Sequence, residues 1–253
     1  MQEESKNTFN SYDEENDSVL ITPNGPDPVF YGIRGEDPKS VIYASKMLTH
    51  SEKLDGYMVF KTNQGTGDHL KNKIDIEKFQ PYTSGTISGF VSSVPNIERG
   101  GHVFFMLNTK NKTIKCAVYK PTKITYIAKN LTIGDEVFLG GGVRKASRNH
   151  SRVFNIEFLH IKKLAEIKKL RNPFCQKCKK HMKSEGKNQG FKCIKCNNTS
   201  LKKNTIMIPR QIKVGLYIPT SSAHRHLTRP KERLLKNNTR KKSSKNIQWI
   251  KTF

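Results

Sequence analysis

Acidic residues are scarce in this chain relative to basic ones. Asp and Glu total 21 among 253 residues, whereas Lys and Arg total 46, which gives a formal net charge of +25. Self-repulsion at that charge destabilises a compact protein, and a polyanionic partner would relieve it. Counterion release from a nucleic acid would add a driving force for binding. The charge therefore favours a nucleic acid as partner, with an anionic membrane as the competing choice.

Long apolar segments are also lacking. No run approaches the ~20 residues that span a bilayer, and the first residues, MQEESKNTFNSYDEENDS, are polar and acidic, unlike a secretion signal. Hydrophobic residues make up 34% of the chain, which is low for one large core and favours several small modules. We therefore expect a cytoplasmic protein that binds nucleic acid and has no membrane partner.

Common catalytic and nucleotide-binding motifs are absent too. The sequence contains no Walker A lysine loop, no G-x-G-x-x-G and no nucleophile elbow. Five cysteines in a chain without a secretion signal argue against a disulfide framework. Cys116 stands alone in an alternating stretch, where a small buried hydrophobe is a better interpretation than a reactive thiol.

The other four cysteines lie together in NPFCQKCKKHMKSEGKNQGFKCIKC, residues 172–196. Their spacing, C-x2-C-x14-C-x2-C, is close to that of zinc sites in which each Cys-x-x-Cys turn supplies two thiolates. Four thiolates leave the metal no open position, so we expect structural rather than catalytic zinc, with a redox pair as the weaker alternative. The predicted ligands are Cys175, Cys178, Cys193 and Cys196.

Alternating segments between residues 83 and 164 predict a β-barrel. A short helix closed by Gly134 is expected between the third and fourth strands, and the glycines of the fourth strand predict a bulge. This pattern favours an OB barrel over the alternative, a β-sandwich. The five predicted strands are residues 83–95, 102–109, 112–121, 136–146 and 153–164.

The N-terminal part predicts one β-α-β unit. Residues 29–33 and 57–62 are its predicted strands, and Asp37-Pro38 marks the start of the helix between them. A single unit of this kind is too small to be a stable domain. Two polar loops follow its strands. They could contact a ligand or could simply be solvated, and the residues alone slightly favour solvation. Their candidate residues are Arg34 in one loop and Thr62, Asn63, Gln64 and His69 in the other.

Basic side chains on the predicted barrel, the cysteine stretch and the C-terminal segment are candidate nucleic-acid contacts. Lys115, Tyr119 and the neighbours Phe104 and Phe105 could add to the barrel surface, although one phenylalanine must face inward because adjacent strand residues alternate. The predicted RNA-binding residues are Arg34, Lys120, Lys123, Arg144, Lys145, Arg148, Lys177, Lys179, Lys180, Arg225 and Arg229.

Several long motifs occur in a fixed order between residues 27 and 235. These are FYGIRG, VFKTNQGTGDHL, GGHVFF, CAVYKPT, NPFCQKCKKHMKSEGKNQGFKC and HRHLTRP. In content and order they closely resemble the C-terminal part of the archaeal isoleucine-tRNA 2-agmatinylcytidine synthetase family. The resemblance implies a ferredoxin-like domain, an OB domain and a zinc ribbon that together hold an isoleucine tRNA with a wobble cytidine.

The resemblance also implies a reaction. Family members use ATP to activate the 2-position of that cytidine, and agmatine then displaces the activated oxygen, so that the tRNA reads AUA. The family's N-terminal catalytic region, which would handle ATP and agmatine, has no counterpart in this sequence. We therefore expect no catalytic residue here and activity only with a separately encoded catalytic half. The alternatives are a gene model that starts late, a relic, a stand-alone RNA- or single-stranded-DNA-binding protein and, less well supported, a zinc-ribbon transcription component.

The predicted fold class is α+β and multi-module: a partial ferredoxin-like β-α-β unit, a five-stranded OB barrel, a small zinc ribbon and disordered termini. The predicted divisions are a disordered acidic leader (1–26), a partial ferredoxin-like domain (27–80), the OB domain (83–164), the zinc ribbon (172–200), a ribbon-associated C-terminal segment (201–235) and a basic tail (236–253).

Overall fold

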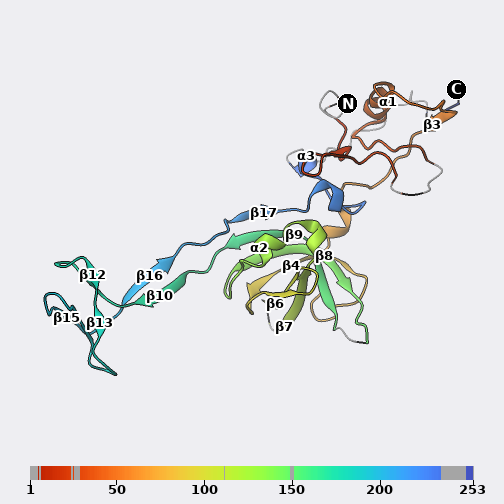
Figure 1. The fold of residues 1–253 in the computed structure, drawn as a ribbon. Coiled ribbons are helices and arrows are strands. Elements are labelled where there is room, and N and C mark those ends of the chain that lie inside the picture. The colour runs from red at the N-terminus through yellow and green to blue at the C-terminus, as the bar shows by residue number, and fades with distance from the viewer. Residues whose placement is uncertain are drawn as a thin grey trace.

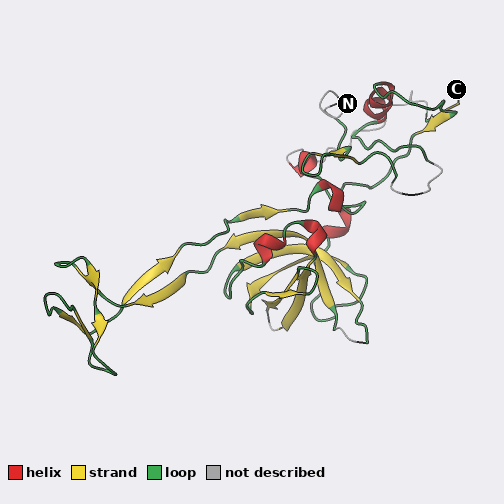
Figure 2. Cartoon of the chain, viewed as in Figure 1, coloured by secondary structure: helices red, strands yellow, loops and turns green. Residues whose placement is uncertain are grey.

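The computed structural model describes residues 5, 7–23, 25, 29–110, 112–148, 151–234 and 249–252. Three parts follow one another in space: a region that contains the clustered cysteines, a central barrel and an N-terminal unit (Figure 1). Strands dominate the first two parts, and the helices are short (Figure 2). Within the described ranges, no helix has the length and apolar character needed to cross a bilayer.

The central sheet closes into a barrel because each of its five long strands pairs with a neighbour on both sides. Its sheet runs in the order β17-β9-β7-β6-β4-β8, and an additional pairing of β8 with β9 completes the circle. The contact between β7 and β9 is parallel, whereas the other neighbours are antiparallel. This closure confirms the predicted OB barrel and rules out an open sandwich. The elements are β4 (Ser84–Val91), β5 (Asn96–Glu98), β6 (His102–Thr109), β7 (Lys112–Val118), η2 (Lys120–Thr122), α2 (Thr125–Ala128), β8 (Glu136–Arg144) and β9 (Val153–Lys163).

Alternation along these strands fills the barrel interior. Along β6 every second residue is buried, so Phe105 faces the core while Phe104 remains partly exposed. Cys116 in β7 is fully buried, which confirms its structural interpretation, and burial raises the pKa of its thiol. The interior forms one continuous hydrophobic cluster that draws on all five long strands and on α2.

The glycines of β8 allow the barrel to bend. The register with β9 shifts between Gly140 and Gly141, as the predicted bulge requires. A methyl group at Gly141 would overlap the carbonyl oxygen of Asn155, so the two backbones approach too closely for any side chain. The predicted helix before β8 is shorter than its sequence pattern, since α2 ends at Ala128 and a turn leads on to Gly134 at φ +90°.

A two-stranded stalk joins the barrel to the cysteine region. β10 (Ile167–Arg171) pairs antiparallel with β16 (Asn204–Ile208), so the chain leaves and returns along the same path (Figure 1). The sequence patterns did not predict this pairing, because its partners are distant in the sequence and both are largely exposed. Between them lie β11 (Phe174–Cys175), β12 (Lys180–His181), β13 (Lys183–Ser184), β14 (Phe191–Lys192) and β15 (Thr199–Ser200).

The N-terminal unit is built around one helix. Asp37 caps it by accepting a hydrogen bond from the backbone nitrogen of Ser40 at 2.9 Å, and Pro38 occupies its first turn, as predicted. The helix is α1 (Pro38–Lys46), followed by β3 (Gly56–Met58) and η1 (Asp68–Leu70). β3 pairs with β18 (Ile250–Thr252), from the far end of the sequence.

Two expectations for this unit were wrong, and a third, the strand at residues 57–62, holds only at its start because β3 ends at Met58. Residues 29–33 form no strand; Val29 and Phe30 are exposed, and their stretch joins no sheet among the described residues. The expected disordered leader is instead ordered where it is described, with a short hairpin of β1 (Tyr12–Asp13) and β2 (Ser18–Val19). Phe9 and Asp13 are buried there, because the C-terminal segment packs against them.

That C-terminal segment runs back along the molecule. β17 (Gly215–Tyr217) pairs with β9 of the barrel, and η3 (Ser221–Ala223) and α3 (Lys231–Leu234) then reach the N-terminal unit. The segment therefore contacts all three parts, whereas the sequence suggested an association with the ribbon alone. Of the predicted basic tail, residues 236–248 and 253 lie outside the described residues.

Candidate zinc site and nucleic-acid interface

The four clustered cysteines converge on one point. The sulfur atoms of Cys175, Cys178, Cys193 and Cys196 all lie within 4.8 Å of one another. Tetrahedral zinc with Zn–S bonds of ~2.3 Å separates its sulfur ligands by roughly 3.8 Å, so this spacing suits the ion. The Sγ atoms of Cys175 and Cys196 are 3.5 Å apart.

Each Cys-x-x-Cys turn has the same backbone design. Lys179 and Asn197, which follow the second cysteine of each turn, have φ angles of +53° and +57°. Their backbone nitrogens donate to the carbonyl oxygens of Cys175 and Cys193 at 2.9 and 2.8 Å. Two matching turns therefore present two thiols each to a shared centre, as the spacing predicted.

Hydrogen bonds within the cluster shift the pKa values of two of these thiols in opposite directions. Backbone N–H groups of Cys196 and Lys195 lower the pKa of Cys193 to about 6, whereas hydrogen bonding to Cys196 raises the pKa of Cys178 to about 12. Cys193 therefore loses its proton more readily than Cys178. His181 is not part of the cluster, since its Nδ1 lies 3.1 Å from the Asn172 carbonyl oxygen and its ring packs edge-on against Phe174.

The lysines around the cluster face solvent. Lys177, Lys179 and Lys180 are all exposed, and none of the three forms an ion pair with another described residue. Lys192 differs because its Nζ lies 3.9 Å from a carboxylate oxygen of Glu185. The three predicted contact residues of the ribbon are therefore placed where a phosphate backbone could reach them.

A second basic and aromatic surface lies on β6 and β7 of the barrel. The Nζ atom of Lys115 sits 4.6 Å from the ring centre of Phe104. Nearby, the rings of His102 and Tyr119 meet edge-to-face at 5.0 Å, and Arg144 donates to the Tyr119 hydroxyl at 3.2 Å. Strands two and three are the face with which OB barrels bind nucleic acid, so this surface suits stacking and phosphate contact together.

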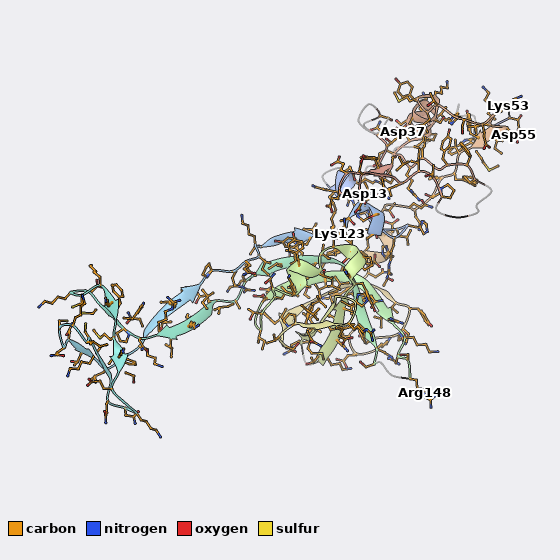
Figure 3. The ribbon with its side chains drawn as sticks, viewed as in Figure 1. Asp13, Asp37, Lys53, Asp55, Lys123 and Arg148 are labelled. Atoms are coloured by element: carbon orange, nitrogen blue, oxygen red, sulfur yellow. The ribbon has the colours of Figure 1, made fainter. Side chains whose placement is uncertain are left out.

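The remaining predicted contacts of the barrel are dispersed. Lys120, Lys145 and Arg148 are exposed, and Figure 3 shows Arg148 at the end of the barrel remote from Lys123. Lys123 lies instead beside the N-terminal segment, where its Nζ bonds to the side-chain oxygen of Asn16 at 2.6 Å and lies 3.6 Å from Glu15. The barrel residues thus do not form one compact patch.

The two polar loops of the N-terminal unit meet. Arg34 donates from Nε to the side-chain oxygen of Gln64 at 2.8 Å. The second loop is held by the HRHLTRP segment, because Gly65 and Gly67 donate their backbone N–H groups to the carbonyls of His226 and Leu227, each at 2.8 Å. The loop is therefore structured rather than merely solvated. The predicted residues at its start, both exposed, are Thr62 and Asn63.

A buried carboxylate joins the barrel to these segments. Glu157 of β9 is 5% exposed, and its two oxygens bind His69 Nε2 at 2.8 Å and Arg225 Nη1 at 3.1 Å. His69 and Arg225 were both singled out from the sequence, but Glu157 was not. Arg229, a further predicted contact, donates to the Arg233 carbonyl oxygen.

A second buried carboxylate fixes the returning chain. Asp135 is fully buried and accepts two hydrogen bonds of 2.7 Å from Arg210, which also donates to the carbonyls of Ala165 and Asn130. The sequence offered a signal for Glu157 alone, a single acidic residue between apolar strand residues in VFNIEF; Asp135 stands beside a second acidic residue in IGDEVF, at the turn before β8. Their partners, 68 and 75 residues away, had no local signal.

Comparison with known proteins matches both ends of this architecture. The family model for the TiaS FLD domain matches residues 1–69, and that for the TiaS C-terminal zinc ribbon domain matches residues 172–212. TiaS of Cenarchaeum symbiosum, an isoleucine-tRNA 2-agmatinylcytidine synthetase, is 50% identical over 88% of this chain.

The chain is similar along most of its length to TiaS proteins. A crystal structure of apo TiaS, an isoleucine-tRNA agmatidine synthetase, aligns with 92% of the chain at a TM-score of 0.75 and 36% identity, covering 54% of that protein. The complex of TiaS with its isoleucine tRNA and ATP aligns with 94% of the chain at a TM-score of 0.74 and 33% identity, again covering 54%. The chain spans about half the length of the curated relatives it matches, and it corresponds to their C-terminal portion.

The family match and the geometry agree on the metal. A zinc-ribbon model covers the cysteines, and their four sulfur atoms are spaced as the ion requires. The ribbon is therefore a structural zinc site held by four cysteines. The FLD match begins at residue 1, which agrees with the ordered hairpin found where the sequence suggested a leader.

Proposed function

We propose that this chain is the tRNA-holding part of an ATP-dependent isoleucine-tRNA 2-agmatinylcytidine synthetase. The observation that carries the proposal is the alignment of 94% of the chain with the complex of TiaS, isoleucine tRNA and ATP. The partner proposed is an isoleucine tRNA with a wobble cytidine, and the place of action is the cytoplasm. A related complex with AMPCPP and agmatine supports ATP and agmatine as the other substrates.

The basic surfaces of the chain would provide the contacts to the tRNA. The net charge of +25 provides counterion release on binding, and exposed lysines of the ribbon and the aromatic–basic face of β6 and β7 provide local contacts. The proposed contacts are the predicted set: Arg34, Lys120, Lys123, Arg144, Lys145, Arg148, Lys177, Lys179, Lys180, Arg225 and Arg229.

We assign no catalytic step to a residue of this chain. Activation of the cytidine 2-position by ATP and displacement by agmatine would require the polypeptide that matches the other half of the relatives' length. In that division of labour, zinc keeps the ribbon folded, and the barrel and ribbon orient the tRNA toward the catalytic half.

A reconstitution experiment tests the proposal. An isoleucine tRNA transcript with a wobble cytidine is incubated with ATP, agmatine and this chain, either alone or with the half of the Cenarchaeum symbiosum relative that this chain does not cover. Digestion and mass spectrometry then measure agmatine-modified cytidine. We expect modification only when both polypeptides are present and only with cytidine at the wobble position. Tight tRNA binding without modification in the reconstituted mixture would favour a stand-alone RNA-binding protein instead.

A further inference from the structure

A small cavity lies where three distant segments of the chain cross. It measures about 140 Å³, opens to solvent, and is lined by the N-terminal segment, the Arg34 loop and the HRHLTRP segment. Figure 3 places Asp13 at this junction, where its carboxylate accepts from the backbone nitrogen of Ser222 at 3.1 Å. Four polar side chains of the lining carry the argument: Asn10, Arg34, His224 and Arg225.

Two buried acceptor atoms of this lining have no partner within the described part of the chain. These are Oδ1 of Asn10 and Nδ1 of His224. The Nε2 atom of His224 lies 3.0 Å from the Pro219 carbonyl, which can only accept, so Nε2 carries the hydrogen. Burial lowers the pKa of His224, which keeps the ring neutral and leaves Nδ1 as an acceptor. Buried acceptors of this kind require a hydrogen-bond donor.

Two guanidinium groups line the same cavity, and each is held by one nitrogen. Arg34 uses Nε to bind Gln64, and Arg225 uses Nη1 to bind Glu157. Glu157 is itself buried and also bound by His69, so it fixes Arg225 rather than remaining available to the cavity. Each arginine therefore has further N–H groups that can bind an anion, and a planar guanidinium matches phosphate oxygens well.

The two unpaired acceptors and the two guanidinium groups together indicate the chemistry of the ligand: it must donate hydrogen bonds and carry negative charge. A bare phosphate offers acceptor oxygens and would leave Asn10 and His224 unpaired. Water could satisfy both acceptors but would bring no negative charge to Arg34, which is bound by the neutral amide of Gln64. A ribonucleotide offers both functions, since its 2′-hydroxyl donates a hydrogen bond and its phosphate carries the negative charge.

We propose that this cavity binds a ribonucleotide, whose 2′-hydroxyl donates to His224, whose base N–H groups can donate to Asn10, and whose phosphate binds Arg34 and Arg225. The inference rests on RNA being the partner in the proposed function. It adds a ribose-reading site formed by the N-terminal unit and the HRHLTRP segment, separate from the barrel face and the ribbon. The ribonucleotide can belong to an RNA strand or be a free nucleotide.

Binding experiments on the zinc-loaded full chain test this site. Fluorescence anisotropy compares an oligoribonucleotide with its 2′-deoxy and 2′-fluoro counterparts of the same sequence. We expect the ribo form to bind about tenfold more tightly, because an acceptor left unpaired on binding is costly. Parallel titrations with AMP and 2′-deoxy-AMP separate the two sources: the same preference for AMP indicates a free nucleotide, and preference in the oligomer alone indicates an RNA strand.

Matched variants assign any preference to the cavity. His224→Phe preserves a planar ring but removes the acceptor, so the ribo and deoxy forms should bind equally. Arg34→Gln should weaken both forms while the ribose preference remains. Lys39→Gln, an exposed cation on α1 outside the cavity, controls for lost charge and should leave both affinities nearly unchanged.

Two results would overturn the inference. One is an equal affinity of the wild-type chain for the ribo and deoxy oligomers; the other is a ribose preference that His224→Phe leaves intact in folded protein. Failure of the proposed function looks different, because the reconstituted mixture would then leave the wobble cytidine unmodified whether or not the chain prefers ribose.

Discussion

The barrel and the ribbon reach a folded state by different means. The barrel has a continuous hydrophobic cluster with contributions from all its long strands, whereas the ribbon's buried cluster consists of two cysteines, Met182 and Phe191. Burial of apolar area stabilises the first. So small a core cannot offset the entropy of ordering the ribbon, so the second depends on its metal. The same chain thus contains one module independent of zinc and one that needs it.

Zinc removal should produce the largest difference in stability between the ribbon and the barrel. Structural zinc contributes roughly 10–16 kcal/mol of apparent binding free energy in small zinc-binding modules. Chelation, or Cys175→Ser, should therefore abolish hydrogen-exchange protection at residues 172–200 while the barrel amides remain protected. Mass spectrometry of exchanged peptides measures both regions in one sample.

Cys116 provides the matched control for that experiment. Cys116→Ser changes the same atom in the barrel core, where it should lower barrel stability and leave the zinc content unchanged. Loss of barrel protection on chelation would contradict the independence of the two modules.

The buried Asp135–Arg210 pair should give the next largest effect. Arg210→Met leaves Asp135 buried without its partner, and breaking a buried pair from one side typically costs about 3–5 kcal/mol. We expect a lower midpoint in urea unfolding of the barrel, since Asp135 anchors the turn before β8. The double variant with Asp135→Leu should recover part of the loss; an unchanged midpoint in Arg210→Met would show that the pair holds only the stalk.

A glycine in β8 should have a smaller effect. Gly141→Ala places a methyl group against the Asn155 carbonyl oxygen, and overpacking of this kind costs about 1–3 kcal/mol. Gly142→Ala is the control, because the nearest atom to its methyl group would be the Ser84 hydroxyl oxygen at 3.3 Å. Thermal unfolding of the zinc-loaded protein measures both, and equal shifts in Tm would argue against the close backbone contact.

In the described part of the chain, the junction between the N- and C-terminal segments contains no large hydrophobic cluster. It relies partly on Asp13, whose pKa is lowered to about 2 by hydrogen bonds from Ser222 and Asn16. A lowered folded-state pKa stabilises the fold above the ordinary value of 3.8, and this contribution is lost as the pH falls toward 2. Exchange protection near residues 11–16 and 220–224 should therefore decrease between about pH 4 and pH 2. Asp13→Asn should remove that pH dependence.

The sequence predicted these regions to different degrees, for physical reasons. Alternation located all five barrel strands, because burial on one side imposes a period of two. Cysteine spacing located the zinc site, because two tight turns carry all four ligands. The β10–β16 stalk, the Glu157–Arg225 contact and the Asp135–Arg210 pair were not predicted, since their partners are distant in sequence and none has a periodic pattern.

In the N-terminal unit the sequence instead predicted features that the structure does not contain. The stretch at residues 29–33 is apolar enough to suggest a strand, but strand formation needs a neighbouring strand to accept its hydrogen bonds. The acidic segment before it suggested disorder by composition, yet burial of Phe9 and Asp13 against the far end of the sequence orders it. Composition describes a segment alone and carries no information about a distant partner.

Hydrogen exchange of the zinc-loaded chain with and without isoleucine tRNA tests the central claim most directly. If barrel and ribbon together hold the tRNA, binding should slow exchange both in β6–β7 and around Lys177, Lys179 and Lys180, and raising the salt concentration should remove both effects. Protection confined to the barrel, with the ribbon unchanged, would contradict the account.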